Sequence, residues 1–161
     1  MRYLVRHGHA GDKRTWQGPD SLRPLSGPGR GEAHGLLTQL RDYPITRILS
    51  SPALRCLQTV EPLAQRRGLP VDPAEVLGVD GDPVGLVELL VDPAAEGAVL
   101  CSHGELIGAA LTRLLAPRLP EVGELGWPKG STWVLEVDQG RVRRTQYLAP
   151  LRLQDVKAGY Y

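Results

Sequence analysis

Three short apolar segments of this chain each end in residues that can bind or react, and this arrangement constrains the fold more than any other feature. The segments are residues 3–5, 45–49 and 97–101. The polar residues that follow them are Arg6 and His7, then Ser50, Ser51 and Arg55, and finally Ser102 and His103. Short apolar runs bounded in this way are typical of buried strands. Because open α/β sheets bind ligands at the carboxyl ends of their parallel strands, the three polar groups are expected to face one site.

Helical patterns separate these apolar segments. Residues 27–42 are predicted to form a helix with Ser26 as its N-cap, because apolar residues recur at helical spacing at Ala33, Leu36, Leu37 and Leu40. The next helix is predicted to have Ser51 as its cap and Pro52 as its first residue. Pro62 lies inside that helix and is expected to kink it or split it in two.

The rest of the chain continues the alternation. Residues 84–91 and 105–115 are predicted to be helices, and residues 131–137 and 141–149 the two strands of a late hairpin. This order predicts an α/β fold with three α/β/α layers, in which a mostly parallel sheet carries a late antiparallel strand. A length of 161 residues, 42% of them apolar and 23% charged, fits a single domain over residues 1–161.

Charge and composition exclude several classes of function. The formal net charge of +1 lacks the positive excess expected of a nucleic-acid-binding protein. No apolar run approaches the roughly 20 residues that a membrane helix needs. The two cysteines, Cys56 and Cys101, do not form a CxxC pair, which favours a reducing compartment. With no signal-peptide pattern at the start, we expect a cytoplasmic protein whose partners include neither nucleic acid nor membrane.

The residues at the strand ends suit a phosphoryl group. Arg6 and Arg55 offer planar, permanently charged forks for phosphate oxygens. Arg55 also lies in the first turn of a predicted helix, whose free amides favour an anion. A neutral His7 can attack phosphorus, and nearby positive charge should depress its pKa and keep one ring nitrogen free. Gly8 is expected to act as a hinge that lets Arg6 and His7 address the same anion.

Some features of the loops allow two interpretations. His7 and His9 form an H-x-H pair that could hold a metal, although no matching carboxylate or cysteine cluster completes such a site. The loop at residues 11–24 either forms a lid that reads the substrate beyond its phosphate or is simply exposed, and the residues concerned are Trp16, Lys13, Arg14 and Arg23. Lys129 either reaches the substrate or lies in a solvated turn.

Four segments occur in an order that resembles the histidine phosphatase superfamily, which has the phosphoglycerate-mutase-like fold. They are LVRHG at residues 4–8, LSGPGRGEA at 25–33, ILSSPALRCLQTVEPLA at 48–64 and VLCSHGELI at 99–107. The size of the chain resembles the short branch that includes bacterial phosphohistidine phosphatases. The segment KGSTWVLEV at residues 129–137 is similar to the phosphatase-like domain that follows a Nudix domain in some bacterial proteins.

This resemblance implies that His7 becomes transiently phosphorylated, with no metal and no organic cofactor. It also implies that Arg6, Arg55 and His103 bind the phosphoryl group and stabilise the transition state. Gly8 and Gly104 complete the phosphate-binding set.

The family often has an acidic proton donor shortly after the third strand. This chain has no glutamate at the expected place and offers Glu75, Asp80 and Asp82 instead. We assign the role to Asp80. Without such an acid, good leaving groups such as phosphoramidates would be favoured, because they need less help from protonation.

The predicted function is therefore that of a metal-independent phosphatase with a phosphohistidine intermediate on His7. Its partner is either a small phosphorylated substrate, such as a phosphomonoester or a nucleotide, or a phosphohistidine side chain of a protein. Two alternatives remain: a phosphate-binding module with little turnover, and a phosphotransferase of the phosphoglycerate mutase type. The chain is short for the second alternative, because those mutases carry inserted segments.

Overall fold

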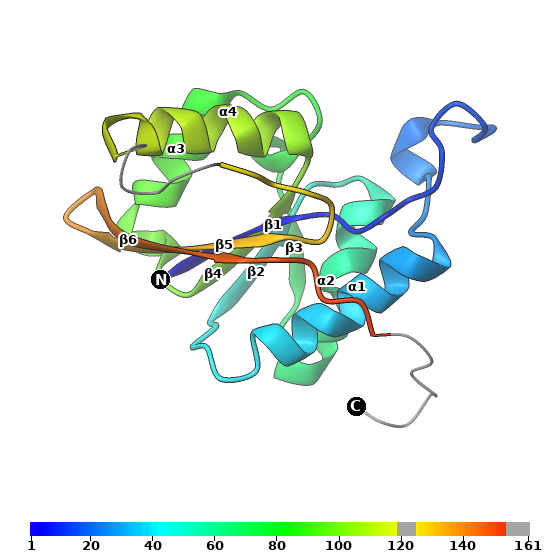
Figure 1. Ribbon diagram of the computed structural model, residues 1–161, viewed down its shortest axis with the longest axis horizontal. Helices are drawn as coiled ribbons and strands as arrows, with labels where there is room; N and C mark the ends of the chain where they lie inside the picture. The colour runs from blue at the N-terminus through cyan, green and yellow to red at the C-terminus, as the bar shows by residue number, and fades with distance from the viewer. Residues whose placement is uncertain (119–124, 154–161) are drawn as a thin grey trace.

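A six-stranded sheet forms the middle layer of the molecule (Figure 1). The computed structural model describes residues 1–118 and 125–153. From one edge to the other, the strands are β3 (Val71–Pro73), β2 (Arg47–Ser50), β4 (Ala98–Ser102), β1 (Arg2–Arg6), β5 (Thr132–Asp138) and β6 (Arg141–Leu148). β1 to β4 run parallel, whereas β5 is antiparallel to both β1 and β6. The carboxyl ends of β1, β2 and β4 therefore meet at one edge, as predicted.

Two helices cover each face of this sheet (Figure 1). α1 (Gly27–Gln39) and α2 (Leu54–Arg67) pack on one face, and α3 (Pro83–Val91) and α4 (Gly104–Leu115) pack on the other. Successive strand residues point to opposite faces, so Leu4 joins the core under α3 and α4 while Tyr3 and Val5 join the core under α1 and α2. The predicted three-layer α/β fold with a mostly parallel sheet is confirmed.

The start of α2 differs from the prediction. Ser51 does not cap the helix, and Pro52 does not begin it, because α2 starts at Leu54 after Ala53, whose side chain makes no capping bond. The Ser51 hydroxyl accepts a hydrogen bond from the Ala53 amide and also bonds His103 across the sheet edge. The prediction for α1 is closer, since Ser26 does cap it by accepting from the Gly29 amide, and the helix ends at Gln39 instead of residue 42.

Pro62 does not split α2, which runs unbroken from Leu54 to Arg67. Pro62 lacks an amide hydrogen and so removes one intrahelical bond. The helix is held on both sides of this position by buried side chains, with Val60 before the proline and Leu63 directly after it. Tertiary packing therefore outweighs the local helix-breaking tendency.

The remaining connections position loops around the sheet edge. Short 3-10 helices occur at Asp20–Leu22 (η1), Glu75–Leu77 (η2), Pro93–Ala95 (η3) and Ala116–Arg118 (η4). The predicted hairpin is present, and its turn places Gln139 and Gly140 at positive φ, a pair of conformations that matches a tight two-residue turn. Among the described residues, no helix has the length and apolar character required to cross a bilayer.

Candidate active site

The carboxyl ends of three strands bring four of the predicted site residues together. Arg6 is the last residue of β1 and His7 follows it; Arg55 lies in the first turn of α2, and His103 immediately precedes α4. The rings of His7 and His103 lie 5.5 Å apart between centroids, and Arg55 Nη2 lies 3.3 Å from His103 Nδ1. Arg6 packs against Gly104, since a Cβ on that glycine would lie 2.7 Å from Arg6 Cζ. We call these four side chains the cage.

His7 is held in one tautomer. Its Nδ1 lies 2.7 Å from the carbonyl oxygen of Gly8 and must donate, because a carbonyl can only accept. The Nε2 atom therefore carries a free lone pair. The pKa of His7 is lowered to about 3, chiefly by burial; Arg55, His103 and Arg6 also lower it, and the Gly8 bond opposes the shift. His7 is thus neutral near pH 7, the state that a nucleophile needs.

His103 is held in the opposite tautomer. Guanidinium groups only donate hydrogen bonds, so His103 Nδ1 accepts from Arg55. Its Nε2 then carries the hydrogen and donates to the Ser51 hydroxyl at 2.8 Å. Ser51 is buried and belongs to the site, in agreement with its place among the polar residues expected at this sheet edge, whereas its predicted capping role is not found. Its position directly after a strand was the available signal.

Arg55 is oriented by the loop that precedes α1. Its Nη1 donates to the main-chain oxygen of Asp20 at 2.9 Å, and its Nη2 lies 3.0 Å from Asp20 Oδ2. The Nε atoms of Arg55 and Arg6 are both buried with no hydrogen-bond acceptor among the described residues. Leaving a buried donor without an acceptor is costly. Each of these arginines therefore has a donor to which a bound anion could supply the acceptor.

Gly8 has a packing role in addition to the one predicted. It is not among the glycines with positive φ, so it is not a left-handed hinge. A Cβ at this position would lie 2.9 Å from the carbonyl oxygen of Gly29 in α1, so glycine allows the two backbones to approach closely. Thr59 then fixes the segment to α2, because its hydroxyl accepts from the Gly8 amide at 3.0 Å and donates to the Arg55 carbonyl at 2.7 Å.

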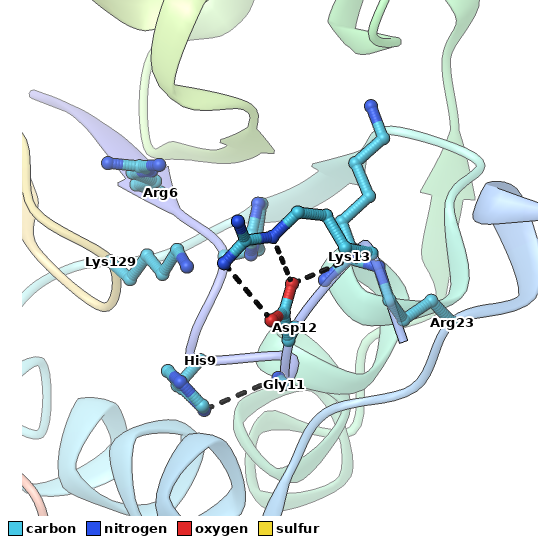
Figure 2. Close-up of a pocket in the computed structure, with 9 residues that line it drawn as sticks. Arg6, His9, Gly11, Asp12, Lys13, Arg23 and Lys129 are labelled. Carbon is cyan, nitrogen blue, oxygen red and sulfur yellow. Dashed lines mark hydrogen bonds and ion pairs between the residues drawn. The ribbon is translucent and has the colours of Figure 1, made fainter. Parts of the chain in front are cut away.

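Two chambers open beside the cage. The first, which we call the basic chamber, has a volume of about 650 Å³, and Figure 2 shows Arg6 at its wall. His7 also lines this chamber. Its other charged lining residues are Asp12, Lys13, Arg14, Arg23 and Lys129. The second, which we call the acidic chamber, has a volume of about 480 Å³, shares Arg55 with the cage and is also lined by Ser51. Its acidic lining residues are Asp20, Glu75 and Asp80.

The loop at residues 11–24 contributes residues to both chambers. Lys13, Arg14 and Arg23 line the basic chamber, which favours the interpretation that this loop contacts a bound ligand. Trp16 is not part of that lining; it is 38% exposed, and its ring nitrogen donates to the Pro19 carbonyl. His9 also lines the basic chamber, where its Nδ1 pairs with the Ser26 hydroxyl at 2.7 Å.

The three candidates for the proton donor lie in different environments. Asp82 caps α3 by accepting from the Val84 amide at 3.0 Å, which gives it a structural role. Glu75 and Asp80 are both exposed and both line the acidic chamber beside Arg55. The assignment of Asp80 therefore stays a prediction, with Glu75 as its neighbour. For metals, no group of three or more histidine, cysteine or acidic residues in the described parts of the chain is arranged to hold an ion.

Comparison with known sequences gives a matching family and several curated relatives. Residues 2–78 match the histidine phosphatase superfamily (branch 1). An 8-oxo-(d)GTP phosphatase of Mycolicibacterium smegmatis is 31% identical over 152 residues, which cover 91% of this chain. The chain spans about half of that relative, 47% of its length.

Solved structures share the fold. The protein histidine phosphatase SixA in complex with tungstate superimposes with a TM-score of 0.70 at 23% identity, covering 94% of this chain and 96% of that one. A candidate phosphohistidine phosphatase SixA from Agrobacterium tumefaciens gives a TM-score of 0.70 at 25% identity, covering 92% and 97%. The expected phosphoglycerate-mutase-like architecture is therefore confirmed over nearly the whole length.

Proposed function

The chain belongs to the histidine phosphatase superfamily, and from this premise we propose that it hydrolyses a phosphorylated compound through a phosphohistidine on His7. The observation that carries the proposal is the state of His7, whose Nε2 lone pair is free and whose ring is neutral beside two arginines and a second histidine. The relative from M. smegmatis acts on a nucleotide and the SixA structures are named for phosphohistidine, so both classes of substrate are candidates.

The first step of the proposed reaction is attack on phosphorus. The Nε2 lone pair of His7 forms the N–P bond, and the leaving oxygen or nitrogen takes the electron pair of the bond that breaks. Phosphoryl transfer spreads negative charge over three equatorial oxygens. Arg6 and Arg55 supply fixed positive donors for those oxygens, with His103 as a further polar contact. In the second step a water oxygen bonds phosphorus and gives a proton to the carboxylate of the acid that protonated the leaving group, the electron pair of the N–P bond returns to His7 Nε2, and inorganic phosphate is released.

The leaving group needs a proton unless it is already a stable anion. We propose Asp80 as the acid that supplies it, because Asp80 lines the acidic chamber that shares Arg55 with the cage. Glu75 lines the same chamber and is the alternative donor. Neither the attack nor the protonation in this scheme requires a metal ion.

The decisive experiment is hydrolysis of a chromogenic aryl phosphate in the presence of a chelator. We expect the native protein to turn over with chelator present, to be inhibited by vanadate and to yield an acid-labile phosphoprotein on rapid quenching. His7→Ala should lose at least about 1000-fold in kcat, because the covalent step disappears. His34→Ala, which removes a histidine of α1 outside the cage, is the matched control and should retain activity.

The outcomes separate the alternatives. Phosphate binding by a native protein that does not hydrolyse the ester would contradict an enzyme and support a binding module. Full activity in His7→Ala, or the absence of any acid-labile phosphoprotein, would contradict the covalent mechanism. Isomerisation of a phosphorylated monoacid in the presence of a bisphosphate primer would support the mutase instead.

A further inference from the structure

The basic chamber concentrates positive charge that the chain as a whole does not have. The protein has a formal net charge of only +1. Five cationic side chains line this one chamber against a single carboxylate, that of Asp12, and the cations are Arg6, Lys13, Arg14, Arg23 and Lys129. A cleft lined by one sign of charge attracts ligands of the opposite sign. The concentration of cations therefore points to an anionic ligand.

Only some of these cations are neutralised by the protein itself. Arg14 pairs with Asp12 at 3.3 Å, and Arg23 pairs with Asp20 at 3.0 Å. For Lys13 and Lys129, no carboxylate among the described residues lies within ion-pair distance. Figure 2 shows Lys129 reaching from one wall of the chamber toward Asp12 on the opposite loop. At least one cation of the chamber is thus available to a ligand.

Asp12 shows where an anion is stabilised. The backbone and side chain of Arg14 donate to its carboxylate and lower its pKa, and the charges of Arg23 and Lys129 lower it further. This carboxylate is exposed to solvent, so an external anion can compete with it for the same cations. Asp12 therefore competes weakly with an external anion for the cations of the chamber.

The chamber is rigidly connected to the cage. The Gly130 amide, next to Lys129, donates to the carbonyl oxygens of both Arg6 and His7 at 3.1 and 3.0 Å. The Arg6 amide in turn donates to the Ser131 carbonyl at 3.0 Å. These bonds fix the backbone that carries Lys129 against the backbone that carries the nucleophile. The backbone from which Lys129 extends is consequently fixed relative to His7.

We propose that the basic chamber is a second anion subsite, which binds another phosphate or carboxylate group of the substrate whose phosphoryl group occupies the cage. The proposal rests on the proposed function and names its substrate class: small molecules with two anionic groups. It disfavours a simple monoester. It also disfavours phosphohistidine in a protein, where the transferred phosphoryl group is attached to an uncharged ring.

Calorimetric titration tests the subsite without requiring turnover. The probes are inorganic phosphate, with one anionic group, pyrophosphate, with two phosphates, and phosphoglycolate, with a phosphate and a carboxylate. All proteins carry His7→Ala, which prevents turnover of the probes; they are His7→Ala alone, the same protein with Lys129→Met, and the same protein with Arg66→Met as a matched control. Arg66 is exposed in the last turn of α2, whereas Arg55 lies in the first turn of that helix.

We expect Lys129→Met to weaken pyrophosphate binding by about tenfold and phosphate binding by at most about twofold. Arg66→Met should change neither affinity by more than about twofold. Asp12→Asn should act in the opposite direction and tighten pyrophosphate binding a few-fold, because it removes the competing charge. If phosphoglycolate follows pyrophosphate, the subsite takes either anion; if it follows phosphate, the subsite requires a second phosphate.

Equal weakening of phosphate and pyrophosphate in Lys129→Met would overturn the subsite, as would an equal effect in Arg66→Met or unchanged binding in both Lys129→Met and Lys13→Met. The proposed function fails separately. A native protein that binds pyrophosphate with the expected preference but does not hydrolyse aryl phosphate would retain the subsite and lose the enzymatic assignment.

Discussion

The basic and acidic chambers differ in the way they use the two arginines of the cage. Arg6 borders the basic chamber, and its Nη1 donates to a carbonyl oxygen, that of Trp127, at 3.1 Å. Arg55 borders the acidic chamber and is bound by the carboxylate and carbonyl of Asp20. Two residues of the same type and charge therefore meet opposite surroundings on the two sides of one site.

This difference separates two tasks that a phosphatase must perform. Holding an anionic substrate requires cations, whereas protonating a leaving group requires an acid that excess positive charge would keep ionised. Lys13, Lys129, Arg14 and Arg23 line one chamber, and Glu75 and Asp80 line the other. We infer that the basic chamber serves binding and the acidic chamber serves proton transfer. Substitutions around the two chambers test this division.

The largest effect is expected from Arg55→Lys. A lysine keeps the charge but cannot reproduce the planar fork that contacts both Asp20 and His103. We expect kcat/KM for an aryl phosphate to fall on the order of 1000-fold, the upper end of the effect of losing one preorganised donor. Arg47→Lys, at an exposed position at the start of β2, is the control. Near-native rates in Arg55→Lys would remove Arg55 from the site and abolish the contrast with Arg6.

The next effect concerns the acid of the acidic chamber. Asp80→Asn should lower kcat by about 100-fold for an alkyl phosphate, the low end of the range for general acid catalysis, and much less for an aryl phosphate. Glu75→Gln is the matched comparison, since both carboxylates line the same chamber. If Glu75→Gln shows the selective loss and Asp80→Asn does not, Glu75 is the donor. If both variants hydrolyse both substrates at the native rate, this chamber has no role in proton transfer.

The sequence predicted the cage well because strand ends are encoded locally. The residues after each apolar run are next to one another in the chain, and the parallel order of the strands brings the runs to one edge. Ser51 shows the limit of this reasoning, because its partner His103 lies 52 residues away and a local pattern of serine followed by proline favoured a cap. The packing role of Gly8 was missed for the same reason, since the backbone it accommodates belongs to Gly29.

The chambers were harder to predict than the cage. Their walls come from loops, where neither helical nor strand periodicity fixes the direction of a side chain. Lys129 could be named as a candidate, but its link to His7 depends on the Gly130 amide bonding back to β1. The short strand β3 was also missed as a strand, because three residues that include a proline carry little β signal.

The buried His7 should make the free energy of unfolding of the protein depend on pH. The pKa of His7 is about 3 in the folded protein, mainly because of burial, and about 6.5 in an unfolded chain. Below pH 6.5 the unfolded state therefore binds a proton that the folded state does not, so acid favours unfolding. From pH 7.5 to 5.0 the free energy of unfolding should fall by about 2 kcal/mol more in the native protein than in His7→Gln. Urea denaturation measures this difference, and parallel pH curves would show that His7 is not held neutral by its surroundings.

The smallest effect is expected from the one carboxylate that connects the two sides. Asp20 lines the acidic chamber and accepts from Arg55, but it also pairs at 3.0 Å with Arg23, which lines the basic chamber. Burial acts to raise the pKa of Asp20, and the Arg23 bond and the charges of Arg55 and Arg23 together lower it, so the group is ionised near pH 7. It thus holds Arg55 in place and at the same time offsets part of its charge.

Asp20→Asn should separate these two contributions in steady-state kinetics on an aryl phosphate. With the charge removed, Arg55 attracts phosphate more strongly, and the inhibition constant of inorganic phosphate should fall by about threefold. With the ion pair weakened, Arg55 is less well oriented, and kcat should fall by about fivefold. Asp42→Asn, at an exposed carboxylate that pairs only loosely with Arg41 at 3.8 Å, should change neither value. If phosphate inhibition weakens together with kcat, Asp20 only maintains the shape of the loop. Its carboxylate then does not offset the positive charge of Arg55.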